Sequence, residues 1–215
     1  MNLKKPFCLT IFGRPGQGKS NLIKYIMSLN HPDYTEQPFR YGIVMCNTSF
    51  NHGYDYLPGG FVHDEFNLGK ISALIDIQKN SGGVHPAFVI LDDCLDKKGF
   101  ENEMLKRLVT QFRHYNISFI LATQYPTLIP TYIRSCCSHV VIFRETNSPS
   151  LTAIYNGFGM AFGTREDFQQ YLMGSTGDHK FIFRATDDTR ENPREVYVVM
   201  KAPRPTEMPE FIYVF

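Results

Sequence analysis

The 215-residue sequence has few cysteines, little excess charge and no long hydrophobic run. Its five cysteines are odd in number and form no CxxC pair, which favours reduced, structural thiols. No stretch approaches the roughly 20 consecutive apolar residues that a membrane-spanning helix needs. No internal repeat or low-complexity tract stands out. We therefore expect a soluble intracellular protein without a membrane span.

A dominant charge of one sign is also lacking. The 22 basic and 21 acidic residues leave a formal net charge of +1, so a nucleic-acid partner would have to be held by local loops and not by a basic body. The hydrophobic content of 43% is enough for one substantial core. We expect a single domain over residues 1–215, with a core at about 6–145 and C-terminal helices, hairpin and tail at 146–215.

Strand and helix patterns alternate through the first two thirds of the chain. An apolar run at 7–12 leads into a glycine-rich turn, and residues 21–29 then carry apolar side chains at helical spacing. Further strands are predicted at 41–46, 87–91, 118–123 and 139–143, and helices at 68–79, 101–115 and 129–136. This alternation predicts an α/β fold with a largely parallel central sheet flanked by helices.

The regular alternation of strand and helix patterns ends at about residue 145. Residues 148–155 and 165–173 are compatible with helices, and 180–184 and 195–201 alternate like the strands of a β-hairpin. The extended tail at 202–215 contains three prolines and ends in an apolar patch. We expect this tail to pack on its own domain or on a neighbouring subunit.

Residues 13–20 read Gly-Arg-Pro-Gly-Gln-Gly-Lys-Ser and fit the P-loop pattern G-x-x-x-x-G-K-[ST]. Glycines allow backbone conformations closed to residues with a Cβ atom, so that successive N–H groups point at phosphate oxygens. The loop lies between a predicted strand and a predicted helix, as the pattern requires. The predicted nucleotide-binding residues are Gly13, Arg14, Pro15, Gly16, Gln17, Gly18, Lys19, Ser20 and Asn21.

Two side chains at the end of this loop have distinct chemistry. Lys19 is predicted to neutralise the β and γ phosphates and to act in catalysis, and Ser20 to ligate Mg²⁺. The helix that begins here adds the positive end of its dipole. The sequence therefore predicts a phosphate site for ATP with Mg²⁺.

An acidic pair, Asp92 and Asp93, follows the apolar strand pattern at 87–91. Asp92 is predicted to act through the coordination shell of the metal, and Asp93 to orient or deprotonate the attacking water. The alternative is that both residues simply cap a turn. Together with the P-loop, an acidic pair favours hydrolysis over kinase chemistry, because a water nucleophile needs a base.

Gln124 follows the predicted strand at 118–123 and so lies at the carboxyl edge of the sheet, where α/β proteins bind ligands. Its amide is predicted to hydrogen-bond the γ-phosphate or the water and to report hydrolysis to the rest of the molecule. Taken alone, a glutamine that opens a loop is usually just solvated. Its place after the P-loop and the acidic pair favours the sensor role.

The ordered set of motifs resembles the FtsK/HerA superfamily, and within it the compact viral genome-packaging ATPases similar to those of poxviruses, other large DNA viruses, virophages, and membrane-containing phages and archaeal viruses. The resemblance runs from about residue 7 to 143. It rests on the P-loop and on the pairs Asp92 and Asp93, Thr123 and Gln124, Ile129 and Pro130, and Ile133 and Arg134. The short length favours the packaging branch, and the fold implied is the RecA-like (ASCE) P-loop fold.

The resemblance implies a homo-oligomeric ring that hydrolyses ATP at subunit interfaces and drives double-stranded viral DNA into a preformed capsid. The implied partners are this DNA and capsid vertex proteins, in the host cell cytoplasm, at the virus assembly site or in the virion. It also implies an arginine finger from the neighbouring subunit, for which Arg134 is the first candidate and Arg113 and Arg144 are alternatives. A surface or salt-bridge role is equally open for each arginine.

Lys97 and Lys98, in a predicted loop just after the acidic pair, are the first candidates for DNA contact, and Lys106 and Arg107 are the second. They would grip phosphates without reading bases, as a packaging motor must on any sequence. The alternative is a solvated charged turn.

Three other functions stay open. A small-molecule kinase would need an acceptor site and an arginine-rich lid, and no convincing lid is seen in the sequence. A nucleotide-dependent assembly switch would hydrolyse ATP negligibly. A translocase for plasmid transfer or helicase-like work would share the chemistry of the packaging motor and differ in the neighbouring genes.

Overall fold

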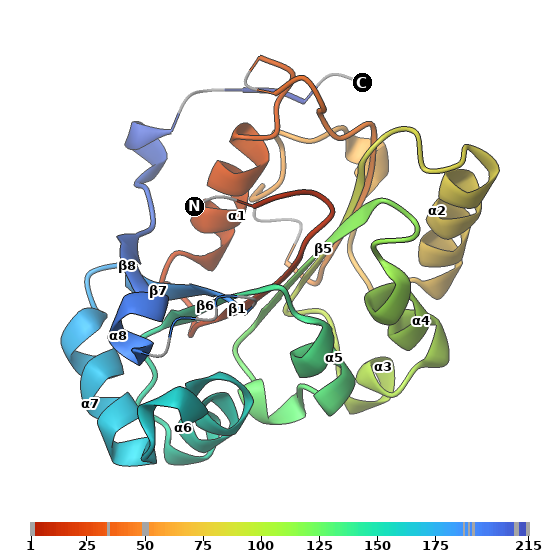
Figure 1. The fold of residues 1–215 in the computed structure, drawn as a ribbon. Coiled ribbons are helices and arrows are strands. Elements are labelled where there is room, and N and C mark those ends of the chain that lie inside the picture. Colours follow the sequence, from red (N-terminus) through yellow and green to blue (C-terminus); the bar gives the residue numbers. More distant parts are fainter. Residues whose placement is uncertain are drawn as a thin grey trace.

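The computed structural model describes residues 3–33, 35–48, 52–186, 188, 190, 192–208 and 211–213. They form an eight-stranded sheet in the order β3-β2-β4-β5-β1-β6-β7-β8 (Figure 1). The strands are β1 (Cys8–Phe12), β2 (Tyr41–Cys46), β3 (Val62–His63), β4 (Ala87–Asp92), β5 (Ile117–Thr123), β6 (His139–Phe143), β7 (Lys180–Ala185) and β8 (Val198–Lys201). Strands β1 to β6 pair in parallel, and β7 and β8 pair antiparallel. The predicted α/β fold with a mostly parallel sheet is confirmed.

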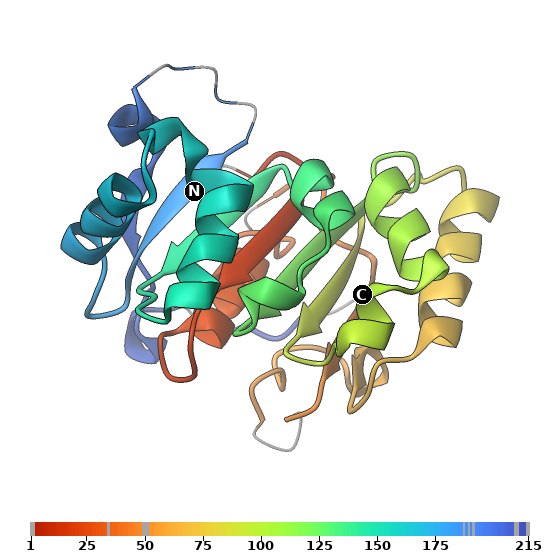
Figure 2. The same cartoon turned by 90° about the horizontal axis from the view of Figure 1, so that it is seen from below.

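Helices cover both faces of the sheet unequally. The helices are α1 (Lys19–Ser28), α2 (Leu68–Asn80), α3 (Lys97–Phe100), α4 (Glu103–Gln111), α5 (Thr131–Cys136), α6 (Ser148–Ile154), α7 (Arg165–Ser175) and α8 (Pro193–Val196). Helix α1 packs on one face, whereas α2, α4, α5, α6 and α7 pack on the other (Figures 1 and 2).

The alternation of side chains along each strand builds these two cores. In β1, Cys8 and Phe12 belong to the core under the five helices, whereas Leu9 and Ile11 belong to the core under α1. Successive side chains of a strand point to opposite faces, so a strand that is buried on both faces reads as a continuous apolar run. This burial explains why the central strands were visible in the sequence.

The region after the acidic pair differs from its prediction. The helix predicted at 101–115 is shorter in the structure, where α4 runs from Glu103 to Gln111 and residues 112–115 form a turn. Asn102 caps α4 by accepting a hydrogen bond from Met104 N at 2.8 Å. Lys97 and Lys98 were predicted to lie in a loop and instead open the one-turn helix α3. Asp96 caps α3 by accepting a hydrogen bond from Gly99 N at 2.7 Å.

The C-terminal part adds two strands to the main sheet. The hairpin prediction is confirmed, since β7 and β8 pair from Lys180 opposite Lys201 to Phe183 opposite Val198. The second strand begins later than predicted because Pro193 opens the short helix α8. Strand β7 also pairs with β6, so the hairpin extends the central sheet.

The described part of the tail packs on its own chain. Tyr213 N donates a hydrogen bond to Tyr56 O at 2.8 Å, the Tyr213 hydroxyl donates to Asn30 O, and the Phe211 ring lies 5.1 Å from the Tyr56 ring. The last two residues of the predicted apolar patch lie outside the described residues. Among the residues described above, no helix is long and apolar enough to cross a membrane.

Candidate active site

The P-loop connects β1 to α1 at the carboxyl edge of the sheet. Gly16 and Gly18 have φ angles of 77° and 104°, a left-handed region that favours glycine. A Cβ atom at Gly18 would also lie 3.2 Å from the Ala202 Cβ atom. The sequence therefore places glycine where the backbone turns and where the segment after β8 approaches the loop.

Side chains of the P-loop form a hydrogen bond and an ion pair with the segment that follows β6. Gln17 Oε1 accepts a hydrogen bond from Arg14 N, and Gln17 Nε2 donates one to Arg144 O, each at 2.7 Å. The Arg14 guanidinium forms an ion pair with Glu145 at 2.9 Å, and Glu145 is only 6% exposed. In this structure the Arg14 side chain thus holds the loop to its neighbour.

Lys19 is buried beside the acidic pair. Its Nζ atom donates to Gly13 O at 2.8 Å and lies 3.1 Å from Asp93 Oδ2, and the Lys19 side chain is 7% exposed. Lysine is almost never this buried unless it is paired, and here both contacts compensate its charge. The P-loop and the acidic pair, which are far apart in the sequence, therefore meet as predicted.

Asp92 at the end of β4 accepts hydrogen bonds from two hydroxyl groups. Ser20 Oγ donates to Asp92 Oδ2 at 3.3 Å, and Tyr54 OH donates to the same atom at 2.8 Å. Burial raises the pKa of the Asp92 carboxyl above its ordinary value, and the hydrogen bond from Tyr54 partly opposes this rise. Burial also raises the pKa of Tyr54 well above its ordinary value, so Tyr54 stays protonated as the donor.

The residues present fit a magnesium ion. A hydroxyl and a carboxylate are oxygen ligands of the type that Mg²⁺ prefers, and Ser20 and Asp92 hold them 3.3 Å apart. Both hydroxyl donors contact Oδ2 of Asp92, and no described residue forms a hydrogen bond with Oδ1. The donor set therefore agrees with the predicted metal-binding pair.

Asp93 has an uncommon backbone conformation that aims its side chain into the site. Its φ angle is 49°, in the left-handed region where residues other than glycine are rare. Asp93 Oδ1 accepts a hydrogen bond from Gln124 N at 2.8 Å, and Asp93 Oδ2 faces Lys19. One carboxylate thus connects the P-loop lysine to the end of β5.

These groups surround one cavity of about 550 Å³. This volume lies in the range of small-molecule sites, about 300–1,000 Å³. The lining residues are Arg14, Pro15, Gly16, Gly18, Lys19, Ser20, Asn21, Thr48, Asp92, Asp93, Gln124 and His179. Ten of the predicted site residues line this cavity, and Gln124 lies next to Asp93, which accepts a hydrogen bond from its backbone N–H.

Gly13 and Gln17 act at the margins of the cavity. Gly13 provides the carbonyl that binds Lys19, and a Cβ atom there would lie 3.0 Å from Phe143 Cδ2. The three candidate arginine fingers lie outside the lining. Arg134 Nη2 donates to Thr131 Oγ1 at 3.2 Å on α5, Arg113 follows α4 with its guanidinium 5.5 Å from the Phe112 ring, and Arg144 Nη1 donates to Thr176 O at 3.3 Å.

Sequence reasoning missed Tyr54, Thr48 and His179. Thr48 belongs to the polar loop after β2, which starts at the same edge of the sheet, and that position was the available signal. Tyr54 and His179 lie in an irregular loop and a turn whose paths depend on tertiary packing. Neither position carries a motif.

The fold is that of the FtsK/HerA-type P-loop ATPases. The chain superposes on the genome packaging NTPase B204 of Sulfolobus turreted icosahedral virus 2 in complex with ATP-gammaS with a TM-score of 0.62 and 14% identity, covering 91% of this chain and 96% of that one. The pCW3 conjugation coupling protein TcpA gives a TM-score of 0.59 with 14% identity, over 92% of this chain and 60% of that one.

Sequence similarity assigns the family more narrowly. The chain is 32% identical over 198 residues to protein 075L of Invertebrate iridescent virus 6, covering 88% of this chain and 75% of the relative. The chain belongs to the family of this iridescent virus protein, which is itself uncharacterised. No protein-family model matches the chain.

Replacing Tyr54 by phenylalanine is expected to weaken Mg²⁺ binding by about 10- to 100-fold, because the hydroxyl group orients the Asp92 carboxylate that would hold the metal. The measurement is a Mg²⁺ titration of the protein bound to ATPγS, followed by thermal stability, with ATP turnover as a second readout. Tyr155→Phe is the matched control, since it also removes a hydroxyl that donates a hydrogen bond at 2.8 Å, in this case to the backbone carbonyl of Gly163 and not to a carboxylate. Equal Mg²⁺ affinity in both variants would show that the Tyr54 hydroxyl does not contribute to Mg²⁺ binding and that the side chain serves only in packing.

Proposed function

We propose that this protein is an ATP hydrolase that translocates double-stranded DNA and packages a viral genome into a capsid. The observation that carries the proposal is the meeting of Lys19, Ser20, Asp92, Asp93 and Gln124 around one cavity. The fold shared with a viral genome packaging NTPase and the sequence similarity to an iridescent virus protein support the packaging role. ATP and Mg²⁺ are the proposed substrate and metal.

From these contacts we assign each residue a role in ATP hydrolysis. Lys19 is held by Gly13 O and Asp93, and the triphosphate of ATP offers it more negative charge than either partner. When Lys19 turns to the phosphates, Asp93 Oδ2 is released to accept a proton from the attacking water. Mg²⁺ bound through Ser20 and Asp92 would supply positive charge to the phosphate oxygens.

Asp93 also offers a route from the chemistry to the rest of the molecule. Its Oδ1 atom binds the backbone N–H of Gln124, at the end of β5, and the Gln124 side chain lines the cavity. A change in the partner of Asp93 therefore acts directly on the segment that contains the proposed sensor. From there the chain continues to α5, which carries Arg134.

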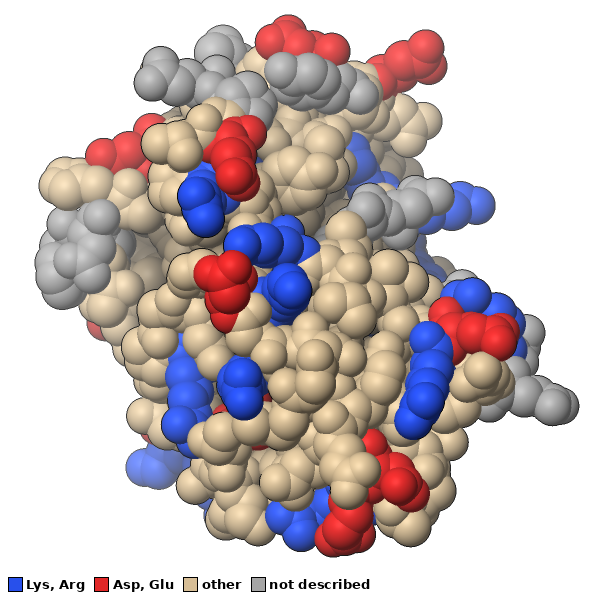
Figure 3. Space-filling view, turned by 90° about the vertical axis from the view of Figure 1, so that its left-hand side faces the viewer, with Lys and Arg blue, Asp and Glu red and all other residues tan. Residues whose placement is uncertain are grey.

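The proposed site of DNA contact is the helix α3. Lys97 and Lys98 are exposed, and α3 begins four residues after Asp93. On the side of the molecule that contains α7 and β8, basic and acidic side chains are interspersed (Figure 3). On β8, Lys201 is paired with Asp178 at 2.5 Å. Lys97 likewise lies 3.9 Å from Glu101, so the proposal for α3 rests on the exposure of its two lysines and on their place next to Asp93.

The test is ATP turnover as a function of protein concentration, with and without duplex DNA. A ring with active sites between subunits is expected to show a steep concentration dependence that DNA enhances. Arg134→Ala is expected to lose this concentration-dependent part, because an arginine finger acts only across an interface. ATP hydrolysis that neither DNA nor protein concentration changes would contradict the translocase and favour a nucleotide switch.

A further inference from the structure

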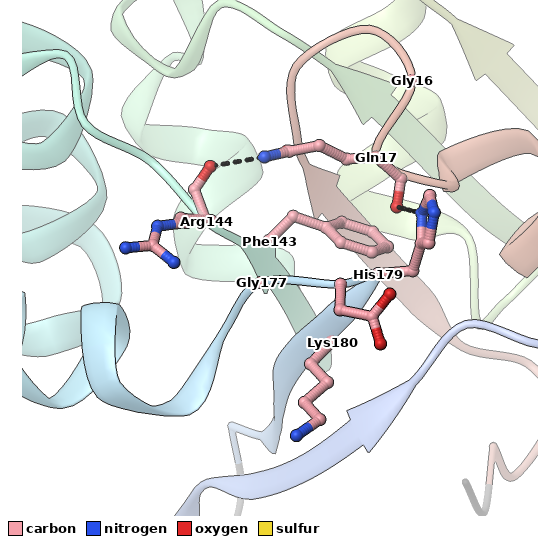
Figure 4. Close-up of a pocket in the computed structure, with 8 residues that line it drawn as sticks. Gly16, Gln17, Phe143, Arg144, Gly177, His179 and Lys180 are labelled. Atoms are coloured by element: carbon pink, nitrogen blue, oxygen red, sulfur yellow. Dashed lines mark hydrogen bonds between the residues drawn. The ribbon is translucent and has the colours of Figure 1, made fainter.

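A second cavity adjoins the P-loop (Figure 4). Its volume is about 350 Å³, and it shares Gly16 and His179 with the cavity described above. The lining residues are Gly16, Gln17, Phe143, Arg144, Gly177, Asp178, His179 and Lys180. The two cavities therefore meet at Gly16 of the P-loop and at His179.

The sheet order places the two cavities on opposite sides of β1. Asp92 ends β4 and Gln124 follows β5, which lie on one side of β1, whereas Phe143 ends β6 and Lys180 begins β7, on the other side. A nucleotide whose terminal phosphate lies near Asp93 must extend its nucleoside away from the acidic pair. The second cavity lies in that direction.

His179 stands at the junction of the two cavities. Its Nδ1 atom lies 3.2 Å from Gln17 O, and because a carbonyl only accepts, Nδ1 must carry the proton of this hydrogen bond. In the neutral ring Nε2 is then an acceptor, able to bind an N–H or O–H group. A ribose hydroxyl and the exocyclic amine of adenine both offer such a donor.

The turn that presents His179 is held by the C-terminal hairpin. Gly177, Asp178 and His179 have φ angles of 128°, 48° and 60°, so three consecutive residues are left-handed. Two contacts with the end of β8 maintain this conformation: the ion pair from Asp178 to Lys201 at 2.5 Å and a hydrogen bond from Ala202 N to His179 O at 2.9 Å. The hairpin therefore fixes an imidazole beside the P-loop.

One aromatic ring and several polar groups line the second cavity. The Phe143 ring lies between Gln17 and the turn at Gly177 (Figure 4). At Gly177, a Cβ atom would lie 3.0 Å from Arg144 Nη1, so glycine lets the guanidinium approach the turn. The wall combines an aromatic ring, an imidazole, a carboxylate and two basic groups, a mixture of apolar and polar groups typical of small-molecule sites.

We propose that this second cavity holds the nucleoside of the bound nucleotide and that His179 contacts the nucleoside directly. The proposal rests on the proposed binding of a nucleoside triphosphate at the P-loop. It gives the C-terminal hairpin a role in the site, since the hairpin supplies the contact that distinguishes a nucleotide from a bare polyphosphate.

The experiment compares two ligands that share the triphosphate and differ in the nucleoside. Dissociation constants for ATPγS and inorganic tripolyphosphate are measured with the unmodified chain, His179→Ala and the control His114→Ala, an exposed histidine at the opposite edge of the sheet. His179→Ala is expected to weaken ATPγS binding roughly 5- to 10-fold, the value of one hydrogen bond, and to leave tripolyphosphate binding unchanged. His114→Ala is expected to change neither.

Three outcomes overturn a proposal, and they are distinguishable. Equal weakening of both ligands by His179→Ala would show that His179 contacts phosphate or only shapes the loop through Gln17. Unchanged binding of both ligands in His179→Ala would show that the nucleoside lies elsewhere. If the unmodified chain binds neither ligand, the proposed function itself fails. His179 is exposed, so the variant is expected to fold, and thermal melting checks this.

Discussion

Replacing Asp93 by asparagine is expected to lower the rate of ATP hydrolysis by about 10²- to 10⁴-fold, the range for losing a general base. Asparagine can still accept the hydrogen bond that Gln124 N donates to Oδ1, but its amide cannot take a proton from water. The substitution also removes the ion pair with Lys19, so ATP binding is expected to persist or tighten. Single-turnover hydrolysis measures the rate, and ATPγS binding measures the affinity.

Asp76→Asn is the matched control for this variant. Asp76 is exposed on α2 and lies 3.9 Å from Lys79, an arrangement that contributes little to stability. This control is expected to hydrolyse ATP at the unmodified rate. If Asp93→Asn does so too, Asp93 is a structural partner of Lys19 and the end of β5, and the catalytic base must be sought elsewhere.

Replacing Lys19 by alanine is expected to lower ATP turnover by about 10²- to 10³-fold, comparable to removing one donor aimed at charge that develops in the transition state. In contrast to Asp93→Asn, this variant is expected to weaken ATPγS binding, because the same ammonium group faces the phosphates in the ground state. Both affinity and turnover are therefore measured, and the contrast between the two variants separates binding from the chemical step.

The control for Lys19→Ala is Lys106→Ala. Lys106 is half-exposed on α4 and lies 3.4 Å from Glu103, an exposed partner. Removing it is expected to leave affinity and turnover unchanged. Because Lys19→Ala leaves Asp93 without its ion-pair partner, thermal melting must show that the variant is folded. A folded Lys19→Ala protein with undiminished ATPγS affinity would contradict a phosphate site at the P-loop.

The central strands and the first helix were predictable because local rules and tertiary packing agree there. In β4, every residue from Ala87 to Asp92 is buried, and a continuous apolar run of this kind is typical of a strand that is covered on both faces. The same holds for α1, whose Leu22, Ile23 and Ile26 face one core. The helix predicted at 101–115 was too long at both ends, because Asn102 caps the start of α4 and the chain turns after Gln111 to enter β5.

Other parts of the site depend on contacts between distant segments. Tyr54 donates to Asp92, which lies 38 residues away, and His179 reaches Gln17 across 162 residues. Neither contact has a sequence pattern, because hydrogen bonds between loops follow from where the folded sheet brings those loops. The antiparallel pairing of β7 with β6, which places the turn of His179 beside the P-loop, is a similar case.

By itself, the sequence determined the P-loop, the acidic pair and the strands that carry them to one edge. It could do so because glycine conformations, the apolar period of buried strands and the chemistry of phosphate binding are local properties. Only the tertiary structure decided that Lys19 pairs with Asp93, that Tyr54 holds Asp92, and that the C-terminal hairpin adds His179 to the P-loop. These contacts join segments whose distance in space is set by the sheet order and not by the residues between them.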